Sequence, residues 1–194
     1  MVLARRVNVD LVVKVGGSLL ALGEQFGAVL EAVGAAALTR PLLVVPGGGP
    51  FADAVRDVDR RLGLSGDTAH WMAVLAMDQY AHLVASRLAA GVVVRDAGDI
   101  GAALEAARVP VLAPSCWLRE ADPLPHTWDV TSDSIAAWFA GQVGARRLVL
   151  IKPPGSPDTG LVDPYFARAL SAQVAAVVVR ANQREALDSA LRAH

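Results

Sequence analysis

The chain has 194 residues, of which 54% are hydrophobic and 19% are charged, and its formal net charge is −1. This composition excludes intrinsic disorder, and the lack of a basic excess argues against nucleic acids and anionic membranes as partners. The single Cys and an N-terminus without an apolar signal segment favour a cytoplasmic protein. We expect one domain, residues 1–194, and no membrane-spanning helix.

Short apolar runs alternate with helical patterns along the whole chain. Runs rich in Val and Leu predict strands at about residues 11–15, 42–45, 92–94, 109–113, 147–151 and 175–179. Helical patterns lie at about residues 24–37, 51–61, 67–89, 99–107, 131–143 and 182–192. The stretches 114–129 and 153–164 are expected to be loops. This alternation indicates an α/β domain with a mostly parallel sheet.

Two glycine-rich turns follow the first two predicted strands. The first turn contains Gly16, Gly17 and Ser18, and the second contains Gly47, Gly48 and Gly49. Each turn lies between a strand and a helix, where unobstructed backbone N–H groups bind an anion. Two such turns predict an anionic donor and an anionic acceptor, as in phosphoryl transfer.

Two other nucleotide-binding motifs fit these turns poorly. A Walker A loop requires Gly-x4-Gly-Lys-Ser/Thr, and neither turn has that spacing. The stretch 47–52 matches the looser G-x-G-x-x-A pattern, with Asp67 about twenty residues further on. In dinucleotide-binding folds that acid ends the next strand, whereas Asp67 lies here in a helical region. We therefore reject this interpretation.

Lysine is rare in this chain. Of the 18 basic residues only two are lysines, Lys14 and Lys152, and each comes at the end of an apolar run of β type. Arg does not replace the compact charge of an ammonium group, so both positions are candidates for a site, which we expect at a solvent-facing cleft. Asp133 begins a predicted helix, where an acid commonly does no more than favour the helix dipole. Its alternative role is to hold the two ammonium groups in place, and the pattern leaves both roles open.

Taken in order, these motifs resemble the amino acid kinase superfamily over about residues 11–163. The resemblance rests on Lys14 with the first glycine turn, the second glycine turn, Asp133 and Lys152. It implies a three-layer αβα sandwich. It also implies that the two lysines stabilise the transferring phosphoryl group and that Asp133 organises them.

The resemblance also assigns ligands to parts of the chain. Acceptor binding is expected at about residues 1–90 and nucleotide binding at about residues 91–194. The residues expected to contact ATP are Gly16, Gly17, Ser18, Lys152, Gly155 and Asp163. Those expected to contact the acceptor are Gly47, Gly48, Gly49, Asp53, Arg56, Asp67 and Asp78. Mg²⁺ would be held mainly by the nucleotide phosphates, because the four His show no metal-ligand spacing; His70 is interpreted as an ordinary polar residue.

A narrower resemblance concerns the acceptor. Segments 68–73, 77–80 and 128–134 are similar to those of superfamily members that phosphorylate an aminomethyl-furan phosphate in methanofuran-type cofactor biosynthesis. This implies an ATP-dependent kinase whose acceptor is a phosphate monoester with a primary amine. Two alternatives stay open: another kinase specificity (uridylate, isopentenyl phosphate or an acylamino acid), or a non-catalytic member that binds an oxyanion or a nucleotide. A homo-oligomer is expected.

Overall fold

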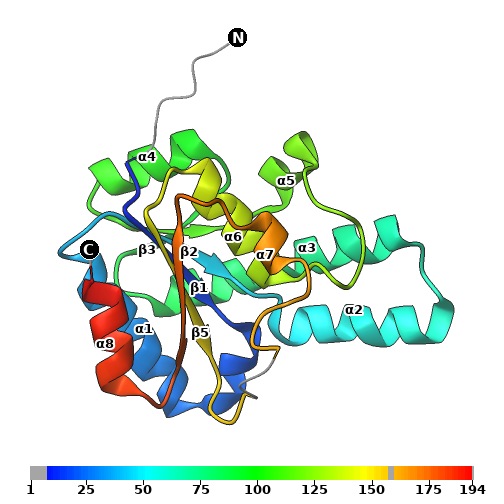
Figure 1. Ribbon diagram of the computed structural model, residues 1–194, viewed down its shortest axis with the longest axis horizontal. Coiled ribbons are helices and arrows are strands. Elements are labelled where there is room, and N and C mark those ends of the chain that lie inside the picture. The colour runs from blue at the N-terminus through cyan, green and yellow to red at the C-terminus, as the bar shows by residue number, and fades with distance from the viewer. Residues whose placement is uncertain (1–7, 157–159, 194) are drawn as a thin grey trace.

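A parallel sheet lies at the centre of the molecule (Figure 1). The computed structural model describes residues 8–156 and 160–193. Within these residues the strand order is β3-β4-β2-β1-β5-β6, and all neighbouring strands are parallel. The strands are β1 (Leu11–Val15), β2 (Leu42–Pro46), β3 (Gly91–Val94), β4 (Val109–Leu112), β5 (Arg147–Lys152) and β6 (Ala175–Arg180). The predicted α/β class is therefore confirmed, and the sheet is parallel throughout.

Helices connect the strands. They are α1 (Glu24–Ala37), α2 (Gly49–Leu62), α3 (Gly66–Arg87), α4 (Ala97–Glu105), α5 (Ser115–Ala121), α6 (Ser132–Gln142), α7 (Phe166–Ala169) and α8 (Arg184–Arg192). Among the described residues, no helix combines the length and the apolar character needed to cross a membrane. We expect no apolar signal segment at the N-terminus, but residues 1–7, which make up most of that segment, lie outside the described residues.

The prediction of a loop at residues 114–129 is wrong at its start, where α5 lies. Leu118 of this helix is buried in the core. The carboxylate of Asp78 accepts hydrogen bonds from the backbone N–H of Ser115, at 3.1 Å, and from its hydroxyl. Both anchors are tertiary contacts, so the local pattern does not reveal the helix. The first glycine turn likewise continues into a short 3₁₀ helix, η1 (Gly17–Leu22), before α1.

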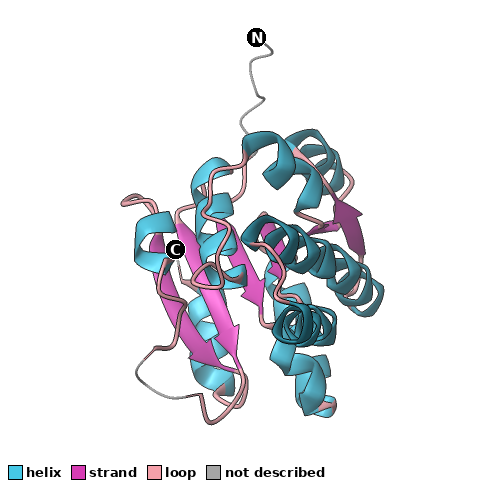
Figure 2. Cartoon of the chain, turned by 90° about the vertical axis from the view of Figure 1, so that its right-hand side faces the viewer, coloured by secondary structure: helices cyan, strands magenta, loops and turns pink. Residues whose placement is uncertain are grey.

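Helices cover both faces of the sheet (Figure 2). Side chains along a strand alternate between the faces. In β1, Leu11 and Val13 pack with α1, α8 and the C-terminal half of α3, whereas Val12 packs with α4 and α6. Every residue of β1 and β2 is buried, as expected for parallel strands that are covered on both sides. The three-layer αβα sandwich is confirmed.

The antiparallel pair α2 and α3 extends beyond the edge of the sheet (Figure 1). Gly63 ends α2 in the left-handed conformation, with φ of 62°. The side chain of Ser65 then caps α3 by accepting the backbone N–H of Thr68 at 3.2 Å, which contributes about 1 kcal/mol. A short connection joins these two caps, and residues from the N-terminal half of each helix form one wall of the site.

Candidate active site

The topology brings the two lysines to one place. Strand β1 lies between β2 and β5, so the order of the chain reverses there, and ligands bind outside the carboxyl ends of strands at such a point. Lys14 is the fourth residue of β1, and Lys152 is the last residue of the adjacent β5. Each lysine has the same parity along its strand as residues that pack on α6, namely Val12 and Leu150. Both side chains therefore point toward α6.

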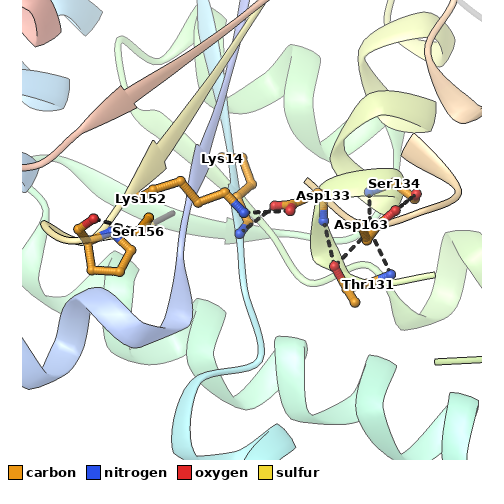
Figure 3. A network of polar contacts seen from close by, with 8 residues as sticks. Lys14, Thr131, Asp133, Ser134, Lys152, Ser156 and Asp163 are labelled. Carbon is orange, nitrogen blue, oxygen red and sulfur yellow. Dashed lines mark hydrogen bonds and ion pairs between the residues drawn. The ribbon is translucent and has the colours of Figure 1, made fainter. Parts of the chain in front are cut away.

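Asp133 meets both lysines from the first turn of α6 (Figure 3). The Nζ atom of Lys14 lies 2.8 Å from Oδ1 of Asp133, and the Nζ atom of Lys152 lies 2.5 Å from Oδ2. We call these three residues the transfer end of the site. The side chains of Lys14 and Asp133 are each 5% exposed, and that of Lys152 is 15% exposed. The expectation of a solvent-facing position is thus wrong for Lys14, because α6 covers it.

Burial and charge act against each other at the transfer end. Burial lowers the pKa of Lys14; the negative charge of Asp133 opposes this, and the positive charge of Lys152 adds to it. Burial also disfavours the charge on Asp133, but the two ammonium groups outweigh it and hold the pKa of this carboxyl below its usual value. Asp133 is therefore ionised at neutral pH. The structure brings Asp133 together with both lysines, as the role of holding the two ammonium groups in place requires.

The two glycine turns pack directly on each other beside the lysines. A Cβ atom on Gly17 would lie 2.1 Å from the backbone nitrogen of Gly49, so no side chain fits there. Gly49 has a positive φ of 55°, which favours glycine. The backbone N–H of Gly47 donates to the carbonyl oxygen of Val15 at 2.9 Å, which joins the second turn to the end of β1. The turns thus form one continuous backbone surface.

A cavity of about 220 Å³ lies between the glycine turns, α2, α3 and α6. It has the transfer end on its wall. Of the residues predicted from the sequence, those that line it are Lys14, Gly17, Ser18, Gly48, Gly49, Asp53, Arg56, Asp133 and Lys152. The cavity also has an apolar part formed by Val74, Met77 and Ile135. The sequence-predicted catalytic residues and much of the predicted acceptor site therefore share one cavity.

Six predicted site residues do not line the cavity: Gly16, Gly47, Asp67, Asp78, Gly155 and Asp163. Three of them are acids with protein partners. Asp78 holds the start of α5, and Asp67 contacts His126. Asp163 accepts hydrogen bonds from the first turn of α6 (Figure 3). Gly155 lies just beyond β5 with a φ of 74°.

Charged and aromatic side chains form a second group on the cavity wall, which we call the acceptor end: Asp53, Arg56, His70 and Trp128. Nη1 of Arg56 donates to Oδ1 of Asp53 at 2.9 Å, and its guanidinium lies 5.0 Å from the ring centroid of Trp128. The indole N–H of Trp128 donates to Oδ2 of Asp59 at 2.7 Å. The segment that carries Trp128 is therefore tied to α2.

His70 lines the cavity, although the sequence pattern indicates an ordinary polar residue. Its ring stacks on that of His126, with centroids 4.1 Å apart and an interplanar angle of 16°. Asp67 and Asp122 contact the two ring nitrogens of His126 at 2.6 and 2.8 Å. Burial lowers the pKa of His126, but these carboxylates outweigh it and raise the pKa. Burial and the nearby charge of His126 lower the pKa of His70 to about 4, so a neutral imidazole faces the cavity.

Fold and site together define a class of protein. The chain belongs to the amino acid kinase family, whose model matches residues 11–153. A curated relative, the [5-(aminomethyl)furan-3-yl]methyl phosphate kinase of Methanocaldococcus jannaschii, is 27% identical over 139 residues. The alignment covers 72% of this chain and 63% of the relative, so the chain spans less than two thirds of that relative's length.

Solved structures with the same fold include two kinases. The uridylate kinase from Archaeoglobus fulgidus superposes with a TM-score of 0.68 at 16% identity, over 96% of this chain and 97% of that one. The UMP kinase from Ureaplasma parvum superposes with a TM-score of 0.64 at 14% identity, over 91% of each chain. At these identities the likeness concerns the fold.

Proposed function

We propose that this protein is an ATP-dependent kinase that transfers a phosphoryl group to the phosphate of a small monoester. The observation that carries the proposal is the transfer end, where two ammonium groups flank one buried carboxylate on the wall of a cavity. Phosphoryl transfer depends mainly on positioning and on cations that neutralise charge at the moving group. Membership of the amino acid kinase family supports the same chemistry.

In the proposed reaction, an oxygen of the acceptor phosphate forms a bond to the γ-phosphorus as the bond from that phosphorus to ADP breaks. Lys14 and Lys152 neutralise the negative charge on the transferring oxygens. Asp133 holds the ammonium groups apart and aligned, and it is ionised for this role because its pKa is low. The acceptor phosphate is already anionic, so the reaction needs no general base.

The nucleotide would lie against the first glycine turn and the end of β5. We assign phosphate contacts to the backbone of Gly16, Gly17 and Ser18. The rest of the nucleotide would bind to the part at about residues 91–194, with a further contact to Gly155. Among the described residues, no three acidic, His or Cys side chains converge to hold a metal ion. In the proposal, Mg²⁺ arrives on the ATP phosphates, where it keeps several waters and needs few protein ligands.

The proposed acceptor is [5-(aminomethyl)furan-3-yl]methyl phosphate, the compound in the name of the curated relative. Pockets for drug-sized ligands typically enclose roughly 300–1,000 Å³, so a cavity of about 220 Å³ favours a small acceptor. Arg56 and the backbone of Gly48 and Gly49 would bind its phosphate. Asp53 is the acid of the acceptor end, since Asp67 and Asp78 are engaged elsewhere, and we assign it to the ammonium group.

A different acceptor, UMP, is the strongest alternative because both solved neighbours carry that specificity in their names. A non-catalytic role in binding an oxyanion or a nucleotide is the alternative from another class. The transfer end argues against it, because binding alone does not require two ammonium groups held by a buried carboxylate.

The proposal also includes a cytoplasmic location, where ATP is available. It includes a homo-oligomer as well, whose mass light scattering would measure.

An acceptor screen tests the proposal. The purified protein is mixed with ATP, Mg²⁺ and one of four acceptors: the aminomethyl-furan phosphate, its analogue without the amine, UMP or isopentenyl phosphate. We expect ADP release and a diphosphate product, seen by ³¹P NMR, with the first acceptor and weaker turnover without the amine. Efficient phosphorylation of UMP alone would overturn the acceptor. If no ADP is released with any of the four acceptors, the result would favour the non-catalytic alternative.

A further inference from the structure

We propose that Asp163 is a positioning residue that fixes Asp133 through the first turn of α6, rather than a ligand of the nucleotide. The inference rests on the proposed function, because it concerns the placement of the lysines for phosphoryl transfer. Asp163 lies in the segment that follows β5, so it reaches α6 from a different part of the chain (Figure 3).

The Asp163 carboxylate is saturated by donors from α6. Its Oδ2 accepts the backbone N–H of Thr131 at 2.8 Å, the hydroxyl of Thr131 at 2.7 Å and the backbone N–H of Ser134 at 3.0 Å. Its Oδ1 accepts the hydroxyl of Ser134, which is fully buried. Four donors leave this carboxylate little capacity to bind a ligand.

The bonds lie on both sides of Asp133 in the sequence. Thr131 precedes Asp133 by two positions and is the N-cap of α6, while Ser134 follows it directly. A helix N-terminus has unpaired backbone N–H groups and frays unless acceptors satisfy them. Asp163 supplies those acceptors at the turn that carries Asp133. Loosening this turn would move Asp133, and the two ammonium groups would shift with it because both are paired with its carboxylate.

The charge of Asp163 acts in the same direction. Burial lowers the pKa of Lys14, and the negative charge of Asp163 is one of the influences that raise it. Without that charge, the pKa of Lys14 would fall further. Lys14 and Lys152 are the only lysines in the chain, so a lysine-specific signal reports on this site alone.

Enzyme kinetics form the first half of the test. For Asp163→Asn we expect kcat to fall by about 10- to 100-fold, since small displacements of catalytic groups have effects of that size. The KM for ATP should stay within about threefold of the wild-type value, because no nucleotide contact is removed. Asp96→Asn is the control: Asp96 is the N-cap residue of α4 and accepts the backbone N–H of Asp99 at 2.9 Å, so this carboxylate also stabilises the start of a helix, but a different one from the helix that carries Asp133. It should keep the wild-type kcat.

Lysine NMR forms the second half and needs no turnover. In protein labelled with ¹³C at lysine Cε, two signals are expected. We expect both to move in Asp163→Asn, with the Lys14 signal titrating at lower pH than in the wild type, and neither to move in Asp96→Asn. Ser134→Ala removes one bond to Asp163 and leaves the charge, so it should shift the signals less and in the same sense. Ser134→Ala also tests the inference if the Asp163→Asn protein does not fold.

The outcomes separate this inference from the proposed function. Unchanged lysine signals with normal kcat and reduced stability would make Asp163 a helix cap only. A raised KM for ATP with normal kcat would make it a nucleotide ligand. Either result overturns the inference. If the wild-type protein transfers no phosphoryl group to any acceptor, the proposed function fails, and the NMR measurement still decides the role of Asp163.

Discussion

The transfer end and the acceptor end of the cavity are built in different ways. The transfer end stands on the central strands β1 and β5 and on a pinned helix turn, and none of its side chains is more than 15% exposed. The acceptor end stands on α2, α3 and the segment 122–130. Its Asp53 and Arg56 side chains are 73% and 44% exposed.

This difference separates two requirements of the proposed kinase activity. A buried charge keeps one position because its partners and the lack of solvent fix it, which suits the transition state. An exposed ion pair contributes little to stability and can rearrange, which suits the recognition of one acceptor among several. We therefore expect substitutions at the transfer end to change kcat and those at the acceptor end to change KM.

The largest effect is expected when each lysine of the transfer end is replaced by Arg. Lys14→Arg and Lys152→Arg keep the charge but spread it over a larger planar group, and a displacement of about 1 Å lowers kcat on the order of 10²-fold. Asp133→Asn should lower kcat similarly, since the ammonium groups lose their shared counter-charge. Steady-state kinetics with saturating ATP and acceptor measures all three variants.

Thermal unfolding separates the two lysine variants. Lys14 is enclosed, and a Cβ on the neighbouring Gly16 would already lie 2.9 Å from a carbonyl oxygen and 3.6 Å from Nζ of Lys14. We therefore expect Lys14→Arg to lower the Tm, and Lys152→Arg, at the more open position, to lower it less. Near-normal kcat in either variant would show that this lysine does not stabilise the transferring group.

A moderate effect is expected at the acceptor end. Arg56→Ala removes one charged hydrogen-bond donor, typically worth about 1.5–3 kcal/mol, so KM for the phosphate acceptor should rise by about 10- to 100-fold. We expect kcat to change much less, because the transfer end is intact. Arg60→Ala is the control: Arg60 lies one turn further along α2 and also pairs with an acid, Asp57, but does not line the cavity. Equal KM values for the two variants would contradict the assignment of Arg56.

The sequence predicts the sheet and singles out the two lysines of the transfer end because both depend on local patterns. Apolar runs mark the strands; Lys14 is the fourth of the five residues of β1, and Lys152 is the last of the six residues of β5. Parallel strands have their carboxyl ends at the same edge of the sheet, so the sequence indicates that the lysines share one edge, whereas the structure was needed to show that β1 and β5 are neighbours. The rarity of lysine then singles out Lys14 and Lys152. Asp133 needed the structure, since an acid in the first turn of a helix is common.

The acceptor end is harder to predict because its contacts join distant parts of the chain. His126 contacts Asp67, which lies 59 positions earlier, and Trp128 bonds to Asp59, 69 positions earlier. Contacts between such distant residues leave no periodic pattern in the sequence. For the same reason the sequence places Asp78 at the acceptor, whereas its carboxylate holds the start of α5.

The smallest effect is expected at His126, the residue behind the acceptor end. Its folded-state pKa is raised, so its protonated form stabilises the fold fully below the unfolded value of about 6.5, and this contribution is lost as the pH rises through the raised pKa. His126→Gln should therefore lower the Tm by roughly 2–4 °C at about pH 6.5, for a loss near 1 kcal/mol, and less at about pH 9. His82→Gln, at an exposed position on α3, is the control.

The choice of pH keeps the neighbouring histidine out of this measurement. The pKa of His70 is lowered to about 4, so this residue affects stability in the opposite direction. Below about pH 6.5 the unfolded chain binds a proton at this position that the folded protein does not bind. His70 therefore lowers the stability of the fold only on the acid side. Between about pH 6.5 and pH 9 the difference between His126→Gln and the wild type therefore follows His126 and its two carboxylates, Asp67 and Asp122. A Tm difference that stays constant over this range would mean that His126 contributes through packing on His70 and Trp71 and carries no stabilising charge.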